Sequence, residues 1–393
     1  MPTPVAIIGP LNPAALGPWF SPADVRDKPL PYQQGGAFLT TLLAARLRRG
    51  MPTIAITSNA AATEPVMRWC GPLLRLWVVR RRIRGSLRDG YREEVRLLRE
   101  ALREAGAPVT HAHWTYEYSL AALTPGFPPA VVTVHDHAGN MLKHLGPLYL
   151  PLYLMSRWTF RHAVKLTAPS PYIAGYVREK TGRDVTVIPN LLEEDAPVVT
   201  ANRIARTSHT PIVVVLANDA AFKNVRGALL AFARWRSRGV AAELRVIGPG
   251  LQPDSRIAAW ARSRNLADGV RFEGPVAHDE ALASIAQCDI LLHPSLDESF
   301  GGPVMEAMEI GIPVIAAREA GGCRFLLDEG KCGLLSSGRS PVEMTGALDR
   351  TWTNKEETSA RVEAAKKRVL VICDPDAALS AYETCYEEAL KRA

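Results

Sequence analysis

The sequence predicts an α/β protein of two doubly wound domains, each with a largely parallel sheet covered by helices on both faces. Three observations lead to this fold class. The chain has 393 residues, which is more than one hydrophobic core usually serves. Short apolar runs alternate with helical patterns from end to end. The alternation stops once, in a polar stretch without periodicity at 193–210, and then starts again.

The first predicted domain comprises residues 1–192. Its apolar runs are short and separated by helical patterns, as in sheets whose strands are buried on both faces. The first long helix is expected at about 36–49. The predicted strands of this domain are 5–9, 53–57, 109–112, 130–134, 165–168 and 185–188.

The second predicted domain comprises residues 211–374, after the 193–210 linker. Its strands are expected at 212–217, 243–247, 270–272, 290–293 and 313–316, and its helices from about 224, at 255–264, at 279–286 and from 303. The tail, 375–393, has an amphipathic pattern with Leu379, Tyr382, Tyr386 and Leu390 on one side. We expect this C-terminal helix to pack back on the first domain.

Bulk composition is typical of a soluble globular protein, with 47% apolar and 22% charged residues. The six cysteines include no close pair with metal-binding or redox spacing, which favours reduced thiols in the cytosol. The sequence shows no signal peptide and no apolar run long enough to span a bilayer. We therefore expect a cytoplasmic protein.

Charge is unevenly distributed along the chain. Residues 1–190 carry 23 Lys and Arg against 12 Asp and Glu, and the remainder carries 24 against 28. Many of the cations are arginines between 80 and 103, within a helical pattern expected to begin near Ser86. Two interpretations remain open. The arginines can form a solvated face paired with nearby glutamates, or the 69–103 segment, with Trp69 and Trp77, can dock peripherally on anionic lipid at the inner face of the cell membrane.

The stretch 294–316 is the most informative part of the sequence. Pro303 suits the first turn of a helix, because its missing N–H would be unpaired there anyway. Free amides at that helix start, approached through Gly301 and Gly302, form an anion site suited to phosphate. Glu298 and Glu306 flank the site, yet carboxylates repel phosphate. A ligand with phosphates in the middle and hydroxyl groups at both ends satisfies both facts, and a nucleoside diphosphate sugar has that layout.

Other candidate residues lie at predicted strand ends. Gly35 and Gly36 precede the first long helix, where amides can approach an anionic group. Lys223 follows the first strand of the second domain and could meet the diphosphate as a mobile point charge. For both features the alternative is an ordinary turn or a solvated loop.

Four histidines occur in two clusters, His111 with His113 and His135 with His137, each closing a predicted strand. A metal site is one interpretation, but two histidines on one strand face lack a clear third ligand. We predict that His135 hydrogen-bonds a sugar hydroxyl, that His111 is structural, and that no metal is bound.

Two common nucleotide motifs are absent. The residues after the first strand, 9–13, do not match the dinucleotide fingerprint, and Gly330-Lys331 is followed by Cys332, so there is no Walker-type phosphate loop. The sequence gives no support for NAD binding or for ATP hydrolysis.

Together these motifs resemble the retaining nucleotide-sugar glycosyltransferases of glycosyltransferase family 4, which have the two-domain GT-B fold. The most specific feature is the Glu298 and Glu306 pair around Phe-Gly. The resemblance extends along nearly the whole chain, through Gly35-Gly36, His111-Ala-His113-Trp114, Thr133-Val-His135-Asp136, Val187-Ile-Pro189-Asn190, Val246-Ile-Gly248, Phe272-Glu-Gly274 and His293-Pro-Ser295.

The resemblance implies a role for each matching residue. Glu298 lies by the donor sugar and His135 contacts it at the reaction centre. Glu306 binds the ribose, Lys223 binds the diphosphate, and base contacts are made by backbone near Gly248 and Val276. The remaining residues assigned to the donor site are Gly35, Gly36, Asn218, Phe300, Gly301, Gly302 and Pro303.

The sequence departs from the family pattern at two positions. Asn218 stands where an arginine is common, and Cys323-Arg324 follows Gly321-Gly322 where many members carry a glutamate. Arg324 is a candidate to replace the missing positive charge.

We therefore predict a glycosyltransferase that moves a sugar from a nucleotide donor, UDP- or GDP-linked, to an acceptor hydroxyl with retention and without a metal. No Asp-x-Asp pair lies at a predicted strand end, which agrees with metal independence. No cofactor or nucleic acid is expected, and the basic first domain suggests a glycan or lipid-linked acceptor of envelope glycan, lipopolysaccharide or exopolysaccharide synthesis. A glycosidase also needs two carboxylates but has no use for a phosphate site. The remaining alternatives are a sugar-nucleotide epimerase of the same fold and a non-catalytic membrane-associated partner protein.

Overall fold

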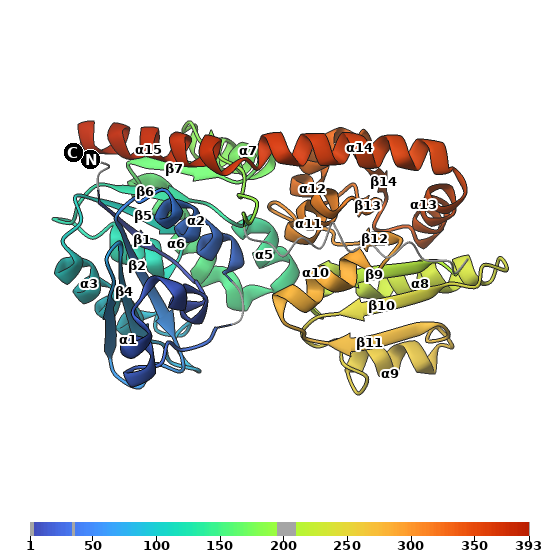
Figure 1. Ribbon diagram of the computed structural model, residues 1–393, viewed down its shortest axis with the longest axis horizontal. Helices are drawn as coiled ribbons and strands as arrows, with labels where there is room; N and C mark the ends of the chain where they lie inside the picture. Colours follow the sequence, from blue (N-terminus) through green and yellow to red (C-terminus); the bar gives the residue numbers. More distant parts are fainter. Residues whose placement is uncertain (1–3, 34–35, 195–209, 393) are drawn as a thin grey trace. The chain divides into compact units, whose positions relative to one another are not determined.

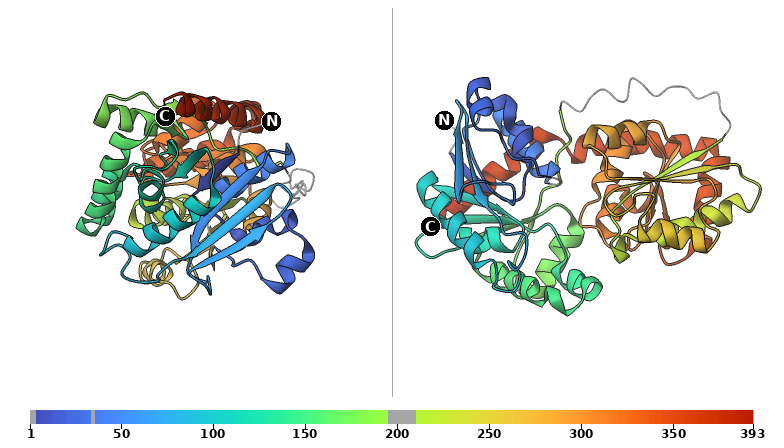
Figure 2. Two further views of the ribbon diagram at one scale, coloured as in Figure 1. Left: turned by 90° about the vertical axis from the view of Figure 1, so that its left-hand side faces the viewer. Right: turned by 90° about the horizontal axis from the view of Figure 1, so that it is seen from below.

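The computed structural model describes residues 4–33, 36–194 and 210–392, in two compact units that each have their own sheet (Figure 1). One unit, here unit 1, holds the chain up to Glu194 and again from Cys373 onward. The other, unit 2, ends at Ile372. Helices cover both faces of each sheet, as Figure 2 shows, so the predicted fold class of two Rossmann-like α/β domains is confirmed.

Unit 1 is built on an eight-stranded sheet with the order β3-β4-β2-β1-β5-β6-β7-β8. Its strands are β1 (Val5–Ile8), β2 (Thr53–Asn59), β3 (Val66–Cys70), β4 (Leu74–Arg80), β5 (Val109–His113), β6 (Ala130–Thr133), β7 (Lys165–Ala168) and β8 (Thr186–Val187). Its helices are α1 (Pro22–Asp27), α2 (Ala37–Arg48), α3 (Arg92–Ala105), α4 (Glu117–Ala122), α5 (Ala138–Leu145), α6 (Leu150–His162), α7 (Pro171–Thr181) and α15 (Pro375–Lys391), with 3-10 turns η1 (Pro13–Trp19) and η2 (Pro147–Tyr149).

Unit 2 has a six-stranded, wholly parallel sheet with the order β11-β10-β9-β12-β13-β14. Its strands are β9 (Ile212–Leu216), β10 (Glu243–Ile247), β11 (Val270–Gly274), β12 (Ile290–His293), β13 (Val314–Ala317) and β14 (Leu334–Ser336). Its helices are α8 (Val225–Arg236), α9 (Arg256–Ser263), α10 (His278–Ala286), α11 (Gly302–Ile310), α12 (Gly321–Leu326), α13 (Pro341–Thr353) and α14 (Lys355–Ile372), with 3-10 turns η4 (Ala221–Lys223) and η5 (Asp328–Gly330).

The apolar runs are continuous because both faces of each sheet are buried. Along β1, Val5 and Ile7 belong to the core beneath α2 and α15, and Ala6 and Ile8 belong to the core beneath α3 and α4. Successive side chains of a strand point to opposite faces. A strand covered on both sides therefore shows no polar alternation.

The hairpin formed by β3 and β4 differs from the prediction. The two strands are antiparallel, with Val66 opposite Val79 and Cys70 opposite Arg75. Our sequence interpretation placed no strand between 57 and 109. Trp69, Leu74, Trp77 and Val78, from this hairpin, are core residues with exposed fractions of 5% or less.

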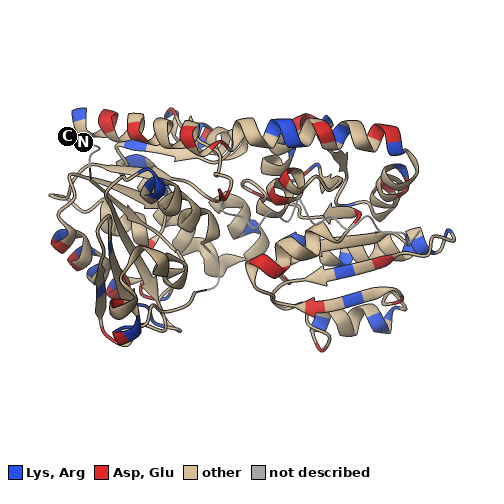
Figure 3. Cartoon of the chain, viewed as in Figure 1, with Lys and Arg blue, Asp and Glu red and all other residues tan. Residues whose placement is uncertain are grey.

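Helix α3 begins at Arg92, six residues later than predicted. Tyr91 adopts a left-handed conformation with φ of 59°, which ends the preceding turn and starts the helix. Both signs of charge alternate along α3 in Figure 3. Arg82 pairs with Asp89 and Glu94, and Arg96 pairs with glutamates on its own helix.

These contacts decide part of the question whether the 69–103 segment forms a solvated face of paired arginines or docks on anionic lipid. Its tryptophans lie in the core, so the prediction that they help this segment to dock on lipid was wrong. The paired-arginine interpretation holds for Arg82 and Arg96. No helix among the described residues is both long and apolar enough to cross a membrane.

The last helix, α15, packs on unit 1. Tyr382 and Tyr386 join the core beneath α2, and Lys165 pairs with Glu388 at 2.6 Å. The fully buried Arg46 of α2 reaches Glu383. The Tyr386 hydroxyl lies 2.8 Å from Nδ1 of His111, so the C-terminal helix contacts the middle of strand β5.

Removing the Tyr386 hydroxyl should destabilise unit 1. Tyr386→Phe leaves a ring nitrogen of the fully buried His111 without its partner, which costs about 1–3 kcal/mol. We expect the melting temperature to fall by about 2–4 °C for each kcal/mol lost. The matched control is Tyr32→Phe, at an exposed tyrosine. Equal melting temperatures for the two variants would contradict the assigned contact.

Candidate active site

Each sheet has a point at which its strand order reverses. In unit 2 the reversal lies between β9 and β12, because β10 and β11 continue on one side and β13 and β14 on the other. In unit 1 it lies between β1 and β5. Ligands of doubly wound sheets bind beyond the carboxyl ends of the strands at such points. Lys223 follows β9 and Glu298 follows β12, so the fold places both at this position.

Glu298 is held by two side chains in unit 2. Its Oε1 lies 2.6 Å from Nζ of Lys223 and 3.0 Å from Nε2 of His293, the last residue of β12. Both contacts use the same oxygen. The second oxygen, Oε2, is left for another partner.

The two contacts set the charge of Glu298. Burial by itself would raise its pKa, but the charge of Lys223 and the hydrogen bond from His293 outweigh burial and hold the pKa at about 2. The carboxylate is therefore ionised at neutral pH. Since it can only accept, His293 donates its Nε2 proton, and its buried Nδ1 has no hydrogen-bond partner within the described residues.

Backbone contacts fix the loops that carry this pair. The amide of Leu296 donates to the carbonyl of Phe222 at 2.7 Å. The side-chain amide of Asn224 donates to the carbonyls of Pro294 and Gly338 at 3.1 and 2.7 Å. The turn after β9 and the loop after β12 are thus bonded to each other. The side chains of Lys223 and Glu298 meet because hydrogen bonds hold together the two loops that carry them.

The loop then enters α11 through a tight turn. Gly301 has a φ of 103°, a conformation that favours glycine, and Pro303 stands in the first turn of the helix. Within the described part of the chain, the amides of Gly301 and Gly302 donate no hydrogen bond. They are free donors at a helix N-terminus, which is where anions bind. The side chain of Phe300 is buried, so only its backbone can meet a ligand.

The first turn of α12, at residues 321–323, packs directly against this loop. The amide of Gly322 donates to the carbonyl of Glu298 at 2.9 Å, and a Cβ on Gly322 would lie 2.4 Å from the backbone nitrogen of Phe300. The buried thiol of Cys323 lies against Gly301. Burial, with a further contribution from the charge of Glu298, raises its pKa well above the ordinary value. Cys323 is therefore a neutral packing group where many relatives in the resembled family carry charge nearby.

The remaining predicted residues of unit 2 surround this centre. Gly248 follows β10 with a φ of 136°, and a Cβ there would lie 1.8 Å from the carbonyl oxygen of Ala217. Its amide donates to the carbonyl of Gly274, two residues before Val276. These loops leave the carboxyl ends of β10 and β11, next to the strand that precedes Lys223.

Three other predicted residues have different surroundings. Glu306, in the second turn of α11, has an Oε1 that lies 3.9 Å from Nε2 of His278. The side chain of Asn218 accepts a hydrogen bond from the amide of Ala220. Arg324 forms an ion pair with Glu329 at the surface. Its use as a substitute charge would require that pair to open, and it stays a prediction.

Unit 1 has two histidines in contact at the carboxyl ends of the neighbouring strands β5 and β6. His135, just beyond β6, lies with its Nε2 2.8 Å from Nδ1 of His113. Its ring packs against both Phe38 and Trp114, with ring centroids 4.3 and 4.7 Å away, and these two rings also contact each other. Burial lowers the pKa of His135 to about 3, so the ring is neutral at pH 7.

His111 takes part in a separate network. Its two ring nitrogens contact Tyr386 and Thr133, at 2.8 and 2.7 Å, which agrees with the structural role predicted for it. No group of three or more His, Cys, Asp or Glu in the described ranges is arranged to hold a metal ion.

Gly36 is the N-cap of α2, with a φ of 75°. A Cβ there would lie 2.4 Å from the carbonyl oxygen of Pro10. It thus brings the start of α2 against the loop that follows β1. Gly35, which we predicted beside it, lies outside the described residues.

Sequence reasoning assigned no role to His293 or to the His113 contact with His135. The His113 contact depends on which side chains meet across the neighbouring strands β5 and β6, and the His293 contact depends on how the loop after β12 returns Glu298 to the end of its own strand. The sequence feature that could have identified both histidines is their position, since each ends a predicted strand.

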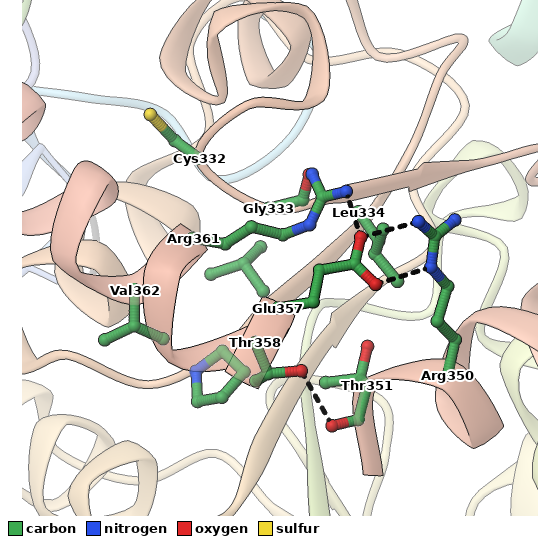
Figure 4. Close-up of a pocket in the computed structure, with 11 residues that line it drawn as sticks. Cys332, Gly333, Leu334, Arg350, Thr351, Glu357, Thr358, Arg361 and Val362 are labelled. Carbon is green, nitrogen blue, oxygen red and sulfur yellow. Dashed lines mark hydrogen bonds and ion pairs between the residues drawn. The ribbon is translucent and has the colours of Figure 1, made fainter. Parts of the chain in front are cut away.

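A second hollow in unit 2 lies away from this centre, at the amino ends of β13 and β14 (Figure 4). Glu357 of α14 projects into it and pairs with both Arg350 and Arg361. The charged groups that line it are therefore engaged with one another. They join α13 to α14, and the hollow is structural.

Glu298 should make stability depend on pH. Its pKa is about 2 in the fold against an ordinary value of 4.5. Ionisation therefore stabilises the fold above pH 4.5, and this contribution is lost as the pH falls toward 2. We expect Glu298→Gln to lower the free energy of unfolding by roughly 3 kcal/mol at pH 7 and by about half of that at pH 3.

Denaturant titration at the two pH values measures this difference. Glu329→Gln serves as the control, because its pair with Arg324 is exposed and should contribute little. A loss for Glu298→Gln that is the same at pH 7 and at pH 3 would exclude the assigned ionisation.

Both halves of the chain match known families. Residues 35–191 match the family described as "Glycosyl transferase 4-like domain", and residues 201–368 match the family described as "Glycosyl transferases group 1". A D-inositol 3-phosphate glycosyltransferase of Corynebacterium glutamicum (strain R) is 35% identical over 160 residues, covering 39% of this chain and 38% of the relative. A glycogen synthase of Mycobacterium tuberculosis (strain ATCC 25618 / H37Rv) is 26% identical over 268 residues, or 66% of this chain and 64% of the relative. The matches to three D-inositol 3-phosphate glycosyltransferases span 28–38% of those proteins.

Solved structures share the fold along the whole chain. The sucrose-phosphate synthase from Thermosynechococcus elongatus superposes with a TM-score of 0.79 at 16% identity and covers 100% of both chains. HepE of Anabaena, in complex with UDP and glucose, gives a TM-score of 0.67 at 17% identity over 98% of this chain and 99% of that one. The chain therefore has the two-domain GT-B fold, and each of its halves matches a glycosyl transferase family.

Proposed function

We propose that this protein is a glycosyltransferase of the hexosyltransferase type. It moves a sugar from a nucleoside diphosphate donor to an acceptor hydroxyl, with retention at the anomeric carbon. The observation that carries the proposal is the Glu298 carboxylate, held between Lys223 and His293 beside the free amides of Gly301 and Gly302. A cation and free helix amides suit a diphosphate, and the adjacent carboxylate suits sugar hydroxyls.

The chemical problem in such a transfer is the charge that develops on the departing diphosphate. Lys223 and the amides before α11 supply positive potential without a metal ion, and they are positioned before the reaction begins. Lys223 is paired with Glu298, so an arriving phosphate competes with the carboxylate for it. Donor binding and the ionisation of Glu298 are thereby coupled.

The two carboxylates take different parts. Oε1 of Glu298 is occupied by Lys223 and His293, which leaves Oε2 to accept from a hydroxyl of the donor sugar. With a pKa near 2, Glu298 does not act as a proton donor at neutral pH. Glu306, one turn into α11, is assigned to the ribose hydroxyls. This division differs from the acid and base pair of a hydrolase.

His135 is assigned to the donor sugar from unit 1. Because burial keeps its pKa near 3, the ring meets a hydroxyl as a neutral hydrogen-bonding group. A neutral ring adds no positive charge next to an oxocarbenium-like centre. The contact with His113 fixes its orientation.

For the donor base we propose uracil, with guanine as the second choice. HepE was solved with UDP and glucose, and a trehalose-6-phosphate protein of E. coli was solved bound with UDP-2-fluoro glucose. For the acceptor we propose a glycan or lipid-linked molecule of envelope glycan, lipopolysaccharide or exopolysaccharide synthesis. The positive charge of the first half of the chain supports an anionic acceptor.

Thermal shift against UDP, GDP and ADP tests the donor. A ligand present at 100 times its Kd stabilises the fold by about 2.7 kcal/mol, and we expect UDP to give the largest shift. The corresponding UDP-sugars are then incubated with candidate acceptors in EDTA, and the anomeric configuration of the product is read by NMR. An inverted product would exclude retention. Isomerisation of the donor without transfer would indicate an epimerase, and no shift with any nucleotide would indicate a non-catalytic protein.

Glu306→Ala should weaken nucleotide binding. Loss of a carboxylate that accepts from two ribose hydroxyls is expected to raise the Kd about 10- to 100-fold, since hydrogen bonds to charged groups contribute about 1.5–3 kcal/mol. Calorimetry with UDP measures the Kd. Glu309→Ala, at a half-buried glutamate one turn further along α11, is the control and should leave the Kd unchanged. Equal affinity of Glu306→Ala and the parent protein would remove Glu306 from the site.

A further inference from the structure

The outer face of α6 and of the preceding turn η2 carries exposed leucines. Leu148 is 78% exposed, Leu154 57% and Leu150 46%, which makes this the densest group of exposed aliphatic residues in the described part of the chain. Leu150, Leu154, Arg157 and Arg161 recur at spacings of four, three and four. They therefore form one stripe along α6, two leucines followed by two arginines.

The surrounding segment has one sign of charge. From residue 137 to residue 178 the sequence contains no aspartate or glutamate, while it contains Lys143, Arg157, Arg161, Lys165 and Arg178. Lys165 is paired with Glu388. Arg161 is exposed and, among the described residues, forms no ion pair. A surface helix that balances its charge internally would carry glutamates on this face, as α3 does.

A neighbouring loop extends the same surface. Gly90 lies against Met155 of α6, where a Cβ on the glycine would be 3.5 Å from the methionine methyl group. This contact places the loop between β4 and α3 beside the helix. The loop carries Ile83, which is 85% exposed, and the exposed Arg84 and Arg88, which make no ion pair in the described ranges.

We propose that this face, formed by η2, α6 and the 81–90 loop, docks unit 1 on an anionic phospholipid membrane. Exposed leucines and an isoleucine can enter the acyl boundary, and arginines without carboxylate partners can meet lipid phosphates. The charge pattern selects this occupant. Asp89, the one carboxylate of the 81–90 loop, is paired with Arg82, and Arg84, Arg88 and Arg161 are left to meet a negatively charged surface beside the exposed aliphatic side chains. The docking residues are those of α6 and Ile83, in place of the tryptophans of the 69–103 segment, which are buried.

This proposal goes beyond the proposed function and does not depend on it. Membrane docking can be measured without donor or acceptor. None of the docking residues belongs to the candidate active site.

The test is co-sedimentation of the full chain with vesicles of phosphatidylcholine alone or with 30 mol% phosphatidylglycerol, a composition chosen as roughly that of an anionic bilayer surface. We expect binding to the anionic vesicles that weakens as salt is raised. Leu148→Ser with Leu154→Ser should reduce the partition coefficient about tenfold or more. Arg161→Gln should reduce it about fivefold.

Two matched controls are available in unit 2. Leu370→Ser changes a leucine that is 59% exposed, a fraction similar to the 57% of Leu154. Arg238→Gln changes an exposed arginine without an ion pair in the described residues. Both should leave vesicle binding unchanged. A melting temperature equal to that of the parent protein reports that the fold of each variant is intact.

Several results would overturn the proposal. They are absence of binding to anionic vesicles at low salt, equal binding to neutral vesicles, or equal losses in the α6 and control variants. Self-association of the chain that is abolished by Leu148→Ser with Leu154→Ser, without vesicle binding, would instead identify the face as an interface between copies.

Discussion

The Glu298 carboxylate, buried against one lysine and one histidine, is the interaction around which unit 2 is organised at its strand ends. A buried carboxylate is costly unless it is paired and hydrogen-bonded. Here the lysine follows β9 and the histidine ends β12, so compensation requires these two strands to be neighbours. The reversal of strand order between them supplies that arrangement. The strand order and the need to compensate the buried charge of Glu298 thus both place this site at the carboxyl ends of β9 and β12.

The second constraint on unit 2 is that the loops at its strand ends approach one another closely, which glycines at the contact points allow. Gly322 lies where a Cβ would collide with the backbone that carries Glu298, and Gly248 lies where a Cβ would collide with the chain leaving β9. Each glycine lets two loops pack edge to edge, which keeps backbone amides near the ligand position. The buried Cys323 fills the space under Gly301.

Much of this was predictable from sequence because it is local. The strand-end positions of Lys223, Glu298 and His135 follow from the order of apolar runs, and the start of α11 follows from Gly-Gly-Pro. The β3–β4 hairpin was missed because Trp69 and Trp77 suit a lipid surface as well as a core. The late start of α3 depends on the left-handed Tyr91, a residue type that rarely adopts that conformation. Contacts between distant parts of the sequence depend on strand order, as for His113 with His135, or on helix packing, as for Tyr386 of α15 with His111. No local pattern contains that information.

The order of elements in unit 1 links its two functional features. His135 stands at the end of β6, and α5 follows at once, with the leucines of η2 and α6 directly after it. Helix α5 has eight residues, which span about 12 Å. A membrane engaged by Leu148 and Leu154 would therefore lie within a short distance of the histidine assigned to the donor sugar. An acceptor anchored in that membrane needs to extend only its head group to reach the reaction centre. Under both proposals, the absence of carboxylates from 137 to 178 keeps negative charge away from the lipid surface and from an anionic acceptor.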